Sequence, residues 1–106
     1  ALLRVGRPAE VTGALQTWVA GHPEDATVWQ LLASNWQAQG QPLRAVRAEA
    51  EARAAHYDYA AAVDRFKAGQ DLARRGGPQV DHIEASIIDT RLRAVQSLLR
   101  EQAAER

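Results

Sequence analysis

Three glycine-x-proline turns recur along the chain at nearly constant spacing. They are Gly6-Arg7-Pro8, Gly40-Gln41-Pro42 and Gly76-Gly77-Pro78, so successive turns begin 34 and then 36 residues apart. Glycine commonly follows the end of a helix, and proline in a first helical turn loses no backbone hydrogen bond. Each turn therefore predicts the end of one helix and the start of the next. A period of this length is typical of arrays built from one repeated supersecondary unit.

The stretch around the second turn has the pattern of an antiparallel helical hairpin. Before the turn, bulky apolar residues recur at helical spacing: Trp29, Leu32 and Trp36, with Ala33 between them. After the turn, one helix face carries only alanine: Ala45, Ala48, Ala52 and Ala55. A bulky face packs well against a thin one, because facing side chains then interdigitate without voids.

The other segments also predict helices, and none alternates convincingly enough to be a strand. The expected helices run from Pro8 to about Ala20, from a cap at Asp25 to about Gln39, from Pro42 to about His56, from a cap at Asp58 to about Arg75, and from about Val80 to Ala104. Residues 1–5 are expected to be the last turn of a truncated helix that Gly6 closes. We therefore expect an all-α fold of about five helices with a long C-terminal helix.

Apolar stripes on these helices predict the core. All three tryptophans, Trp18 included, are expected to lie in it rather than to serve as ligand platforms. The stripes comprise Val11, Ala14, Leu15 and Trp18 in the first helix, Ala62, Val63, Phe66, Gly69 and Leu72 in the fourth, and Ile83, Ile87, Ile88, Leu92, Val95, Leu98 and Leu99 in the last.

Composition excludes several classes of function. Thirteen basic and thirteen acidic side chains balance, so no net charge favours nucleic acid or an anionic membrane surface. There is no cysteine, which excludes disulfides and thiolate metal ligands. No apolar run approaches the roughly 20 residues of a membrane-spanning helix. The chain has no methionine and begins with Ala1, which we interpret as a fragment of a longer protein.

No catalytic, metal or cofactor site is expected within these 106 residues. His22, His56 and His82 are isolated, whereas a helical zinc site needs two histidines four residues apart. Asp81-His82-Ile83-Glu84 opens a helix, where acidic residues cap the chain and favour the helix dipole. Asp71 is expected to pair with Arg75 at the i, i+4 spacing.

The hairpin resembles the tetratricopeptide repeat. Trp29, Leu32, Ala33 and Trp36 match its first helix, and Gly40, Pro42, Ala45 and Ala52 match its turn and second helix. The resemblance implies a right-handed superhelix of antiparallel hairpins, divided into a partial repeat (1–25), a full repeat (26–59) and a degenerate repeat with a capping helix (60–106). Glu49 and Tyr57 depart from the family's preferred bulky apolar residue and proline. An ordinary helical bundle is the alternative.

In this family the first helix of each repeat lines a concave groove, which implies a partner-binding surface here. Its predicted residues are Thr27, Gln30, Ser34 and Gln37, continued by Gln70 and Arg74. Because the first four are polar and uncharged, they favour hydrogen bonding to an extended peptide or a partner helix. The alternative is that they are merely solvated. Arg44, Arg47 and Arg53 alternate with Glu49 and Glu51, which predicts i, i+4 ion pairs rather than a nucleic-acid surface.

A narrower resemblance rests on five segments. They are Leu32-Ala33, residues 36–40, residues 47–52, residues 58–63 and Ile88-Asp89-Thr90-Arg91-Leu92. These are similar to the C-terminal repeat domain of bacterial periplasmic zinc metallopeptidases, whose best-known relative is the beta-barrel assembly-enhancing protease. The resemblance implies a periplasmic module that engages outer-membrane assembly machinery, its own peptidase domain or substrates, with zinc bound upstream of Ala1.

Two other classes of function stay open. One is a repeat scaffold of a secretion, pilus or regulatory complex with no protease attached. The other is a helical-bundle enzyme or nucleic-acid binder, against which the balanced charge counts. The fragment is also expected to form a homodimer if Val11, Leu15 and Trp18 expose an apolar face.

Overall fold

A computed structural model describes residues 8–105 of the chain, and within them the regular structure is helical. The α-helices are α1 (Pro8–Gly21), α2 (Ala26–Ala38), α3 (Pro42–Ala55), α4 (Tyr59–Arg75) and α5 (His82–Ala104), and a short 3₁₀ helix, η2 (Gly77–Gln79), precedes α5. The predicted all-α class and long last helix are confirmed. The helical turn predicted for residues 1–5, and its closure by Gly6, lie outside the described residues.

Local signals set the starts of three helices as predicted. The side chains of Asp25, Asp58 and Asp81 each accept a hydrogen bond from the backbone N–H three residues further on, at 3.2, 3.2 and 3.0 Å. These bonds satisfy N–H groups that have no partner within the helix. The predicted caps at Asp25 and Asp58 are confirmed, and α5 starts at His82 rather than Val80 because Asp81 caps it.

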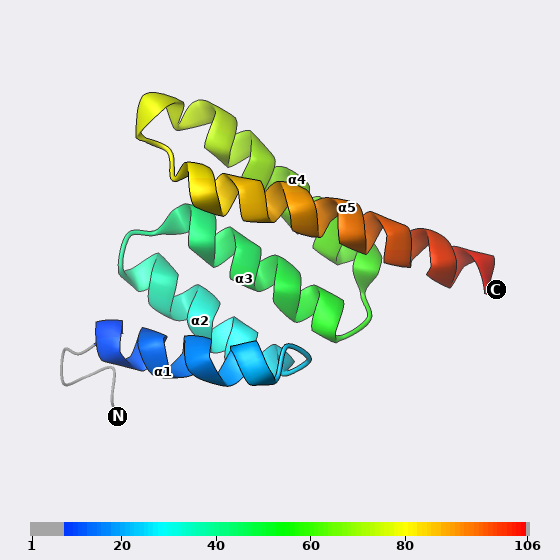
Figure 1. Cartoon of the computed structure of the whole chain (residues 1–106), viewed down its shortest axis with the longest axis horizontal. Coiled ribbons are helices and arrows are strands. Elements are labelled where there is room, and N and C mark those ends of the chain that lie inside the picture. Colours follow the sequence, from blue (N-terminus) through cyan, green and yellow to red (C-terminus); the bar gives the residue numbers. More distant parts are fainter. Residues whose placement is uncertain (1–7, 106) are drawn as a thin grey trace.

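The helices lie side by side in chain order, from α1 to α3, and α4 and α5 together form the other end (Figure 1). Helix α3 packs against α2 on one side and against α4 on the other, and it also touches α5. The molecule is correspondingly thin, with extents of 48 × 32 × 18 Å. Helix α3 is therefore the centre of the fold.

Two apolar clusters meet at α3. The first joins α1, α2 and α3 and consists of Val19, Trp29, Leu32, Ala33, Trp36, Ala45, Ala48 and Ala52. The second joins α3, α4 and α5 and consists of Leu43, Ala50, Ala62, Val63, Phe66, Ile88, Leu92 and Val95. Bulky side chains of α2 thus pack on the thin alanine face of α3, as the hairpin pattern predicts.

Helices α3 and α5 run in the same direction. Arg44 near the start of α3 forms an ion pair with Asp81 at 3.4 Å, and Glu51 near its end pairs with Arg91 at 2.7 Å. Pairs that advance together along both helices require parallel axes, as Figure 1 shows. The hairpin α4–α5 therefore lies beside the hairpin α2–α3 with the second helices of the two aligned.

The predicted stripe on α1 is wrong in part. Trp18 is 48% exposed, whereas Val19 and Thr12 are buried. The contact face of α1 is centred on Thr12, Leu15 and Val19, and Thr12 accepts a hydrogen bond from Gln39 Nε2 at 2.7 Å. Because Leu15 packs against the first cluster, the free apolar face of α1 is smaller than expected. Homodimerisation through this face stays a prediction.

Trp18 has its own polar partners at the edge of α1. Its ring stacks on His22 with the ring centres 3.9 Å apart, and its Nε1 donates to Asp25 Oδ2 at 2.9 Å. This indole donor is the largest cause that lowers the pKa of Asp25 below its ordinary value of 3.8, followed by the backbone N–H of Val28. Trp18 therefore holds the cap of α2 rather than the core.

Candidate binding surface

The predicted groove residues of α2 share one exposed face. Thr27, Gln30, Ser34 and Gln37 are all solvent-exposed, while Trp29 and the rest of the apolar stripe face α3. Their spacing of three or four residues places them in one row along the helix. The structure thus brings these four side chains together on the side of α2 that is free of core contacts.

A polar hollow adjoins this face at Gln30. It has a volume of about 280 Å³ and lies between α2, α3 and the start of α4. Its charged walls were not predicted: Glu49 and Arg53 come from α3, and Asp64 and Arg65 come from α4. Glu49 and Arg65 face each other at 3.8 Å across the hollow. The i, i+4 spacing of Glu49 and Arg53 predicts that both lie on one face of α3, but no sequence signal places Asp64 and Arg65 beside them.

Gln70 and Arg74 lie elsewhere. They line a separate hollow of about 420 Å³ between α4 and α5, together with His82 and Asp89. Gln70 Nε2 donates to Asp89 Oδ1 at 2.8 Å, and Arg74 pairs with Asp71 at 3.3 Å. The structure therefore does not bring them into the hollow at Gln30.

Arg44, Arg47, Glu49 and Glu51 of α3 form ion pairs with other helices, not the i, i+4 pairs predicted within α3. Glu84 of α5 is buried, and its carboxylate accepts a hydrogen bond from Arg47 Nε. Arg91 donates through Nε and Nη2 to the two carboxylate oxygens of Glu51 at 2.7 and 2.8 Å. This hydrogen bonding raises the pKa of Arg91 above its ordinary value. These pairs join α3 to α5, so their role is to hold the two hairpins together.

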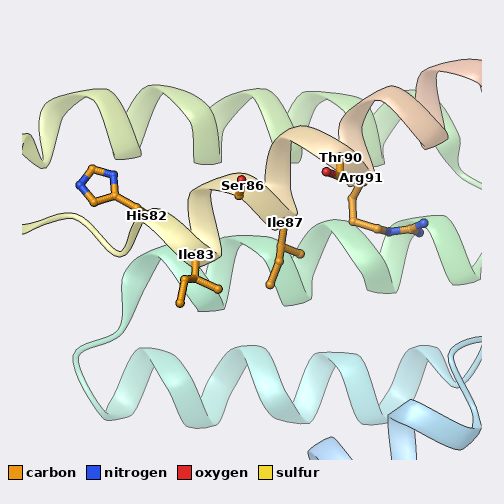
Figure 2. A pocket seen from close by; sticks show the side chains of 6 residues that line it. All are labelled: His82, Ile83, Ser86, Ile87, Thr90 and Arg91. Carbon is orange, nitrogen blue, oxygen red and sulfur yellow. The ribbon is translucent and has the colours of Figure 1, made fainter.

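A shallow apolar surface lies on α5. Figure 2 shows His82, Ile83, Ser86, Ile87, Thr90 and Arg91 along one side of this helix, around a hollow of about 460 Å³. Ile83 is 77% exposed, so its predicted place in the core is wrong. The buried face of α5 is centred on Ile88, Leu92 and Val95. Ile83 lies on an exposed face of the helix, although its neighbours Asp81 and Glu84 pair with α3.

Asp81 and Asp71 have structural partners. Asp81 caps α5, and its pKa lies below its ordinary value chiefly because the backbone N–H of Glu84 donates a hydrogen bond to its carboxylate. Asp71 forms an ion pair with Arg75, as predicted. Among residues 8–105, no cluster of three or more histidine or acidic side chains has the arrangement of a metal site. Within the same residues, no helix is long and apolar enough to cross a membrane.

Comparisons of this chain with protein-family models, with curated proteins and with solved structures find no match.

Proposed function

We propose that this chain is a protein-interaction module built from stacked helical hairpins of the tetratricopeptide type. The partner, an extended peptide or a helix, lies across the exposed face of α2 and reaches into the hollow at Gln30. In a longer array the same stacking continues as a right-handed superhelix, with this face on its concave side.

The observation that supports this proposal most is the parallel alignment of α3 and α5. Two of the ion pairs between them, Arg44–Asp81 and Arg47–Glu84, join residues that lie 37 positions apart in the sequence. Successive repeats in a solenoid place equivalent helices in this way, with each unit contacting its neighbour. A bundle of alternating antiparallel neighbours also makes α3 and α5 parallel, but it does not require the direct ion pairs that join these two helices along their length.

The chemistry of the surface favours a polar ligand without a strong net charge. The row on α2 offers amide and hydroxyl groups, and the hollow contains two carboxylates and two guanidinium groups. Such groups donate to and accept from a peptide backbone, whose N–H and C=O groups alternate. Exposed charges of both signs add specificity more than affinity.

Selection from a random-peptide display library tests the proposal. We expect selected peptides to bind the wild type and to bind the variant Gln30→Trp at least tenfold more weakly, because the tryptophan fills the hollow. A tenfold loss corresponds to about 1.4 kcal/mol of binding free energy. Gln16→Trp, on the exposed side of α1, is the matched control and should bind normally. Equal affinity for both variants would place the site elsewhere.

The narrower resemblance adds a proposal about context. We propose that a periplasmic zinc metallopeptidase domain precedes this module and that the module presents substrates or assembly partners to it. The chemistry would then belong to a His-Glu-x-x-His motif upstream of Ala1. Sequencing the gene upstream tests this, and a different upstream domain would instead support the general scaffold.

A further inference from the structure

Two helix ends in this fold share one backbone geometry. After α2, Gly40 has a φ of +70°, its N–H donates to Gln37 O at 3.1 Å, and the N–H of Gln41 donates to Trp36 O at 2.9 Å. This pair of bonds satisfies the last carbonyl groups of the helix and requires the left-handed conformation that glycine adopts freely.

The end of α3 has the same geometry with tyrosine in the glycine position. Tyr57 has a φ of +65°, its N–H donates to Ala54 O at 2.9 Å, and the N–H of Asp58 donates to Arg53 O at 2.9 Å. The left-handed conformation is disfavoured for every residue that has a Cβ, and more so for a bulky one. The Tyr57 side chain is also 69% exposed, so burial does not offset this strain. A strained and exposed aromatic residue points to a role other than stability.

Tyr57 stands at the edge of a hollow of about 340 Å³. This hollow lies where the start of α2, the end of α3, the start of α4 and the middle of α5 come together, and it shares no lining residue with the hollow at Gln30. Tyr57 and Tyr59 meet edge to face there, with ring centres 6.3 Å apart. Leu98 of α5, which is partly exposed, adds an aliphatic wall.

The charges of this hollow favour a cation. Glu51 and Arg91 both line it, but they neutralise each other through their two hydrogen bonds. Glu24 also lines it, and its carboxylate has no ion-pair or hydrogen-bond partner among residues 8–105. One negative charge therefore remains beside two tyrosine rings. Aromatic faces attract cations, and a neighbouring carboxylate strengthens that preference.

The fold already contains one such contact. The guanidinium of Arg47 lies 5.6 Å from the centre of the Trp29 ring, so one face of that ring is occupied by a cation from within the chain. Trp29 also lines the hollow, and its Nε1 donates to Pro23 O at 2.8 Å on the wall of the same hollow. Tyr59 packs partly against the second apolar cluster, whereas Tyr57 is 69% exposed, so the Tyr57 ring is the one most open to a ligand.

We propose that this hollow binds a lysine or arginine side chain of a partner protein. The aliphatic stem packs on Leu98, and the charged head lies between the Tyr57 ring and the Glu24 carboxylate. Such a ligand contact accounts for a tyrosine, rather than a glycine, at this left-handed position. This site is independent of the proposed groove on α2, because the two hollows have no residue in common.

Blocked tripeptides with a central lysine, norleucine or glutamate test this proposal. Binding is followed by the indole N–H signals of the three tryptophans in nuclear magnetic resonance spectra. We expect the lysine peptide to shift the Trp29 signal in a saturable manner, while the signal of Trp36, which is buried in the first cluster and does not line the hollow, stays unchanged as an internal control. The norleucine and glutamate peptides should bind at least threefold more weakly, as the loss of a cation–π contact implies.

Three variants separate binding from folding. Tyr57→Gly should raise the folding equilibrium constant about tenfold, by relief of the left-handed strain, and should weaken binding of the lysine peptide at least threefold. Tyr57→Phe keeps the ring and should bind normally. Glu24→Gln should remove the preference for lysine over norleucine. The proposal is overturned if the lysine peptide causes no Trp29 shift, if norleucine binds equally well, or if Tyr57→Gly binds undiminished.

Discussion

The buried ion pair between α3 and α5 offers a quantitative test of how the two hairpins are joined. Glu84 is 3% exposed and accepts from Arg47 Nε, and Arg44 Nε lies 3.8 Å from its other oxygen. The Arg47 guanidinium lies 5.6 and 5.9 Å from the ring centres of Trp29 and Trp36. The substitution Glu84→Gln removes the negative charge and keeps the shape of the side chain. It leaves Arg47 among aromatic rings without a counter-ion.

The expected cost follows from the burial of Glu84 and the partial burial of Arg47, whose side chains are 4% and 14% exposed. Removing one member of a buried pair costs about 3–5 kcal/mol, because the other charge is left uncompensated. The glutamine amide oxygen still accepts a hydrogen bond from Arg47, so we expect a loss of about 2–3 kcal/mol. For a domain of this size such a loss lowers Tm by about 10–20 °C.

Urea denaturation followed by circular dichroism measures this loss. The matched control is Asp71→Asn, which breaks the exposed pair with Arg75 and should cost less than about 1 kcal/mol. The double variant Arg47→Met with Glu84→Gln should be less destabilised than the two single effects combined, since each removes the same interaction. If Glu84→Gln costs no more than Asp71→Asn, the pair does not join the hairpins as described.

Two further perturbations test local features. An added Cβ meets open space at both Gly40, which has a φ of +70°, and Gly13, which lies inside α1. Gly40→Ala should therefore destabilise the fold by about 1 kcal/mol, and Gly13→Ala should stabilise it by about 0.5–1 kcal/mol. Thermal unfolding that gives both changes the same sign would contradict this. Asp25 has a lowered pKa in the folded state, so its stabilising contribution is present above its ordinary value of 3.8 and is lost as the pH falls through the lower folded-state value. Asp25→Asn should therefore lower the free energy of unfolding near neutral pH and flatten its decline below pH 3.8. A plot of unfolding free energy against pH that runs parallel to that of the wild type would count against the hydrogen bond from Trp18.

The helices were predictable because their limits depend on neighbouring residues. Asp25 and Asp58 cap helices through bonds to N–H groups three positions away, and Gly40 ends α2 by its own φ. The alanine face of α3 also indicated its partner, since only a bulky face fills the space beside it. Such signals require no knowledge of where distant segments lie.

The partners of the charged residues were not predictable in the same way. Arg47 has Glu51 four residues away, which suggested a pair within the helix, but Arg47 pairs with Glu84 and Glu51 with Arg91. These choices depend on the position of α5 beside α3, which is set by the packing of α5 against α4 and α3. In the folded chain, the pairs Arg47–Glu84 and Glu51–Arg91 between helices replace the weaker, exposed pair that Arg47 and Glu51 would form within α3.

The candidate surface was likewise predictable only where its residues belong to a single helix. The row on α2 was recognisable because Thr27 to Gln37 occupy one face of a single helix. The charged walls at Gln30 come from two other helices, and Gln70 faces α5 instead, where it donates to Asp89. Periodicity identifies a face, but only the packing of the helices decides which faces meet.

A paramagnetic label at the start of α3 tests the stacking of the hairpins most directly. The chain has no cysteine, so Gln41→Cys provides a unique attachment site for a nitroxide, and Gln41 is exposed beside the start of α5. The parallel arrangement predicts that the label broadens the amide signals of residues 79–84 and leaves those of residues 98–105 sharp. Broadening of residues 98–105 with sharp signals at 79–84 would mean that α5 runs the other way, and the proposed repeat would then be wrong.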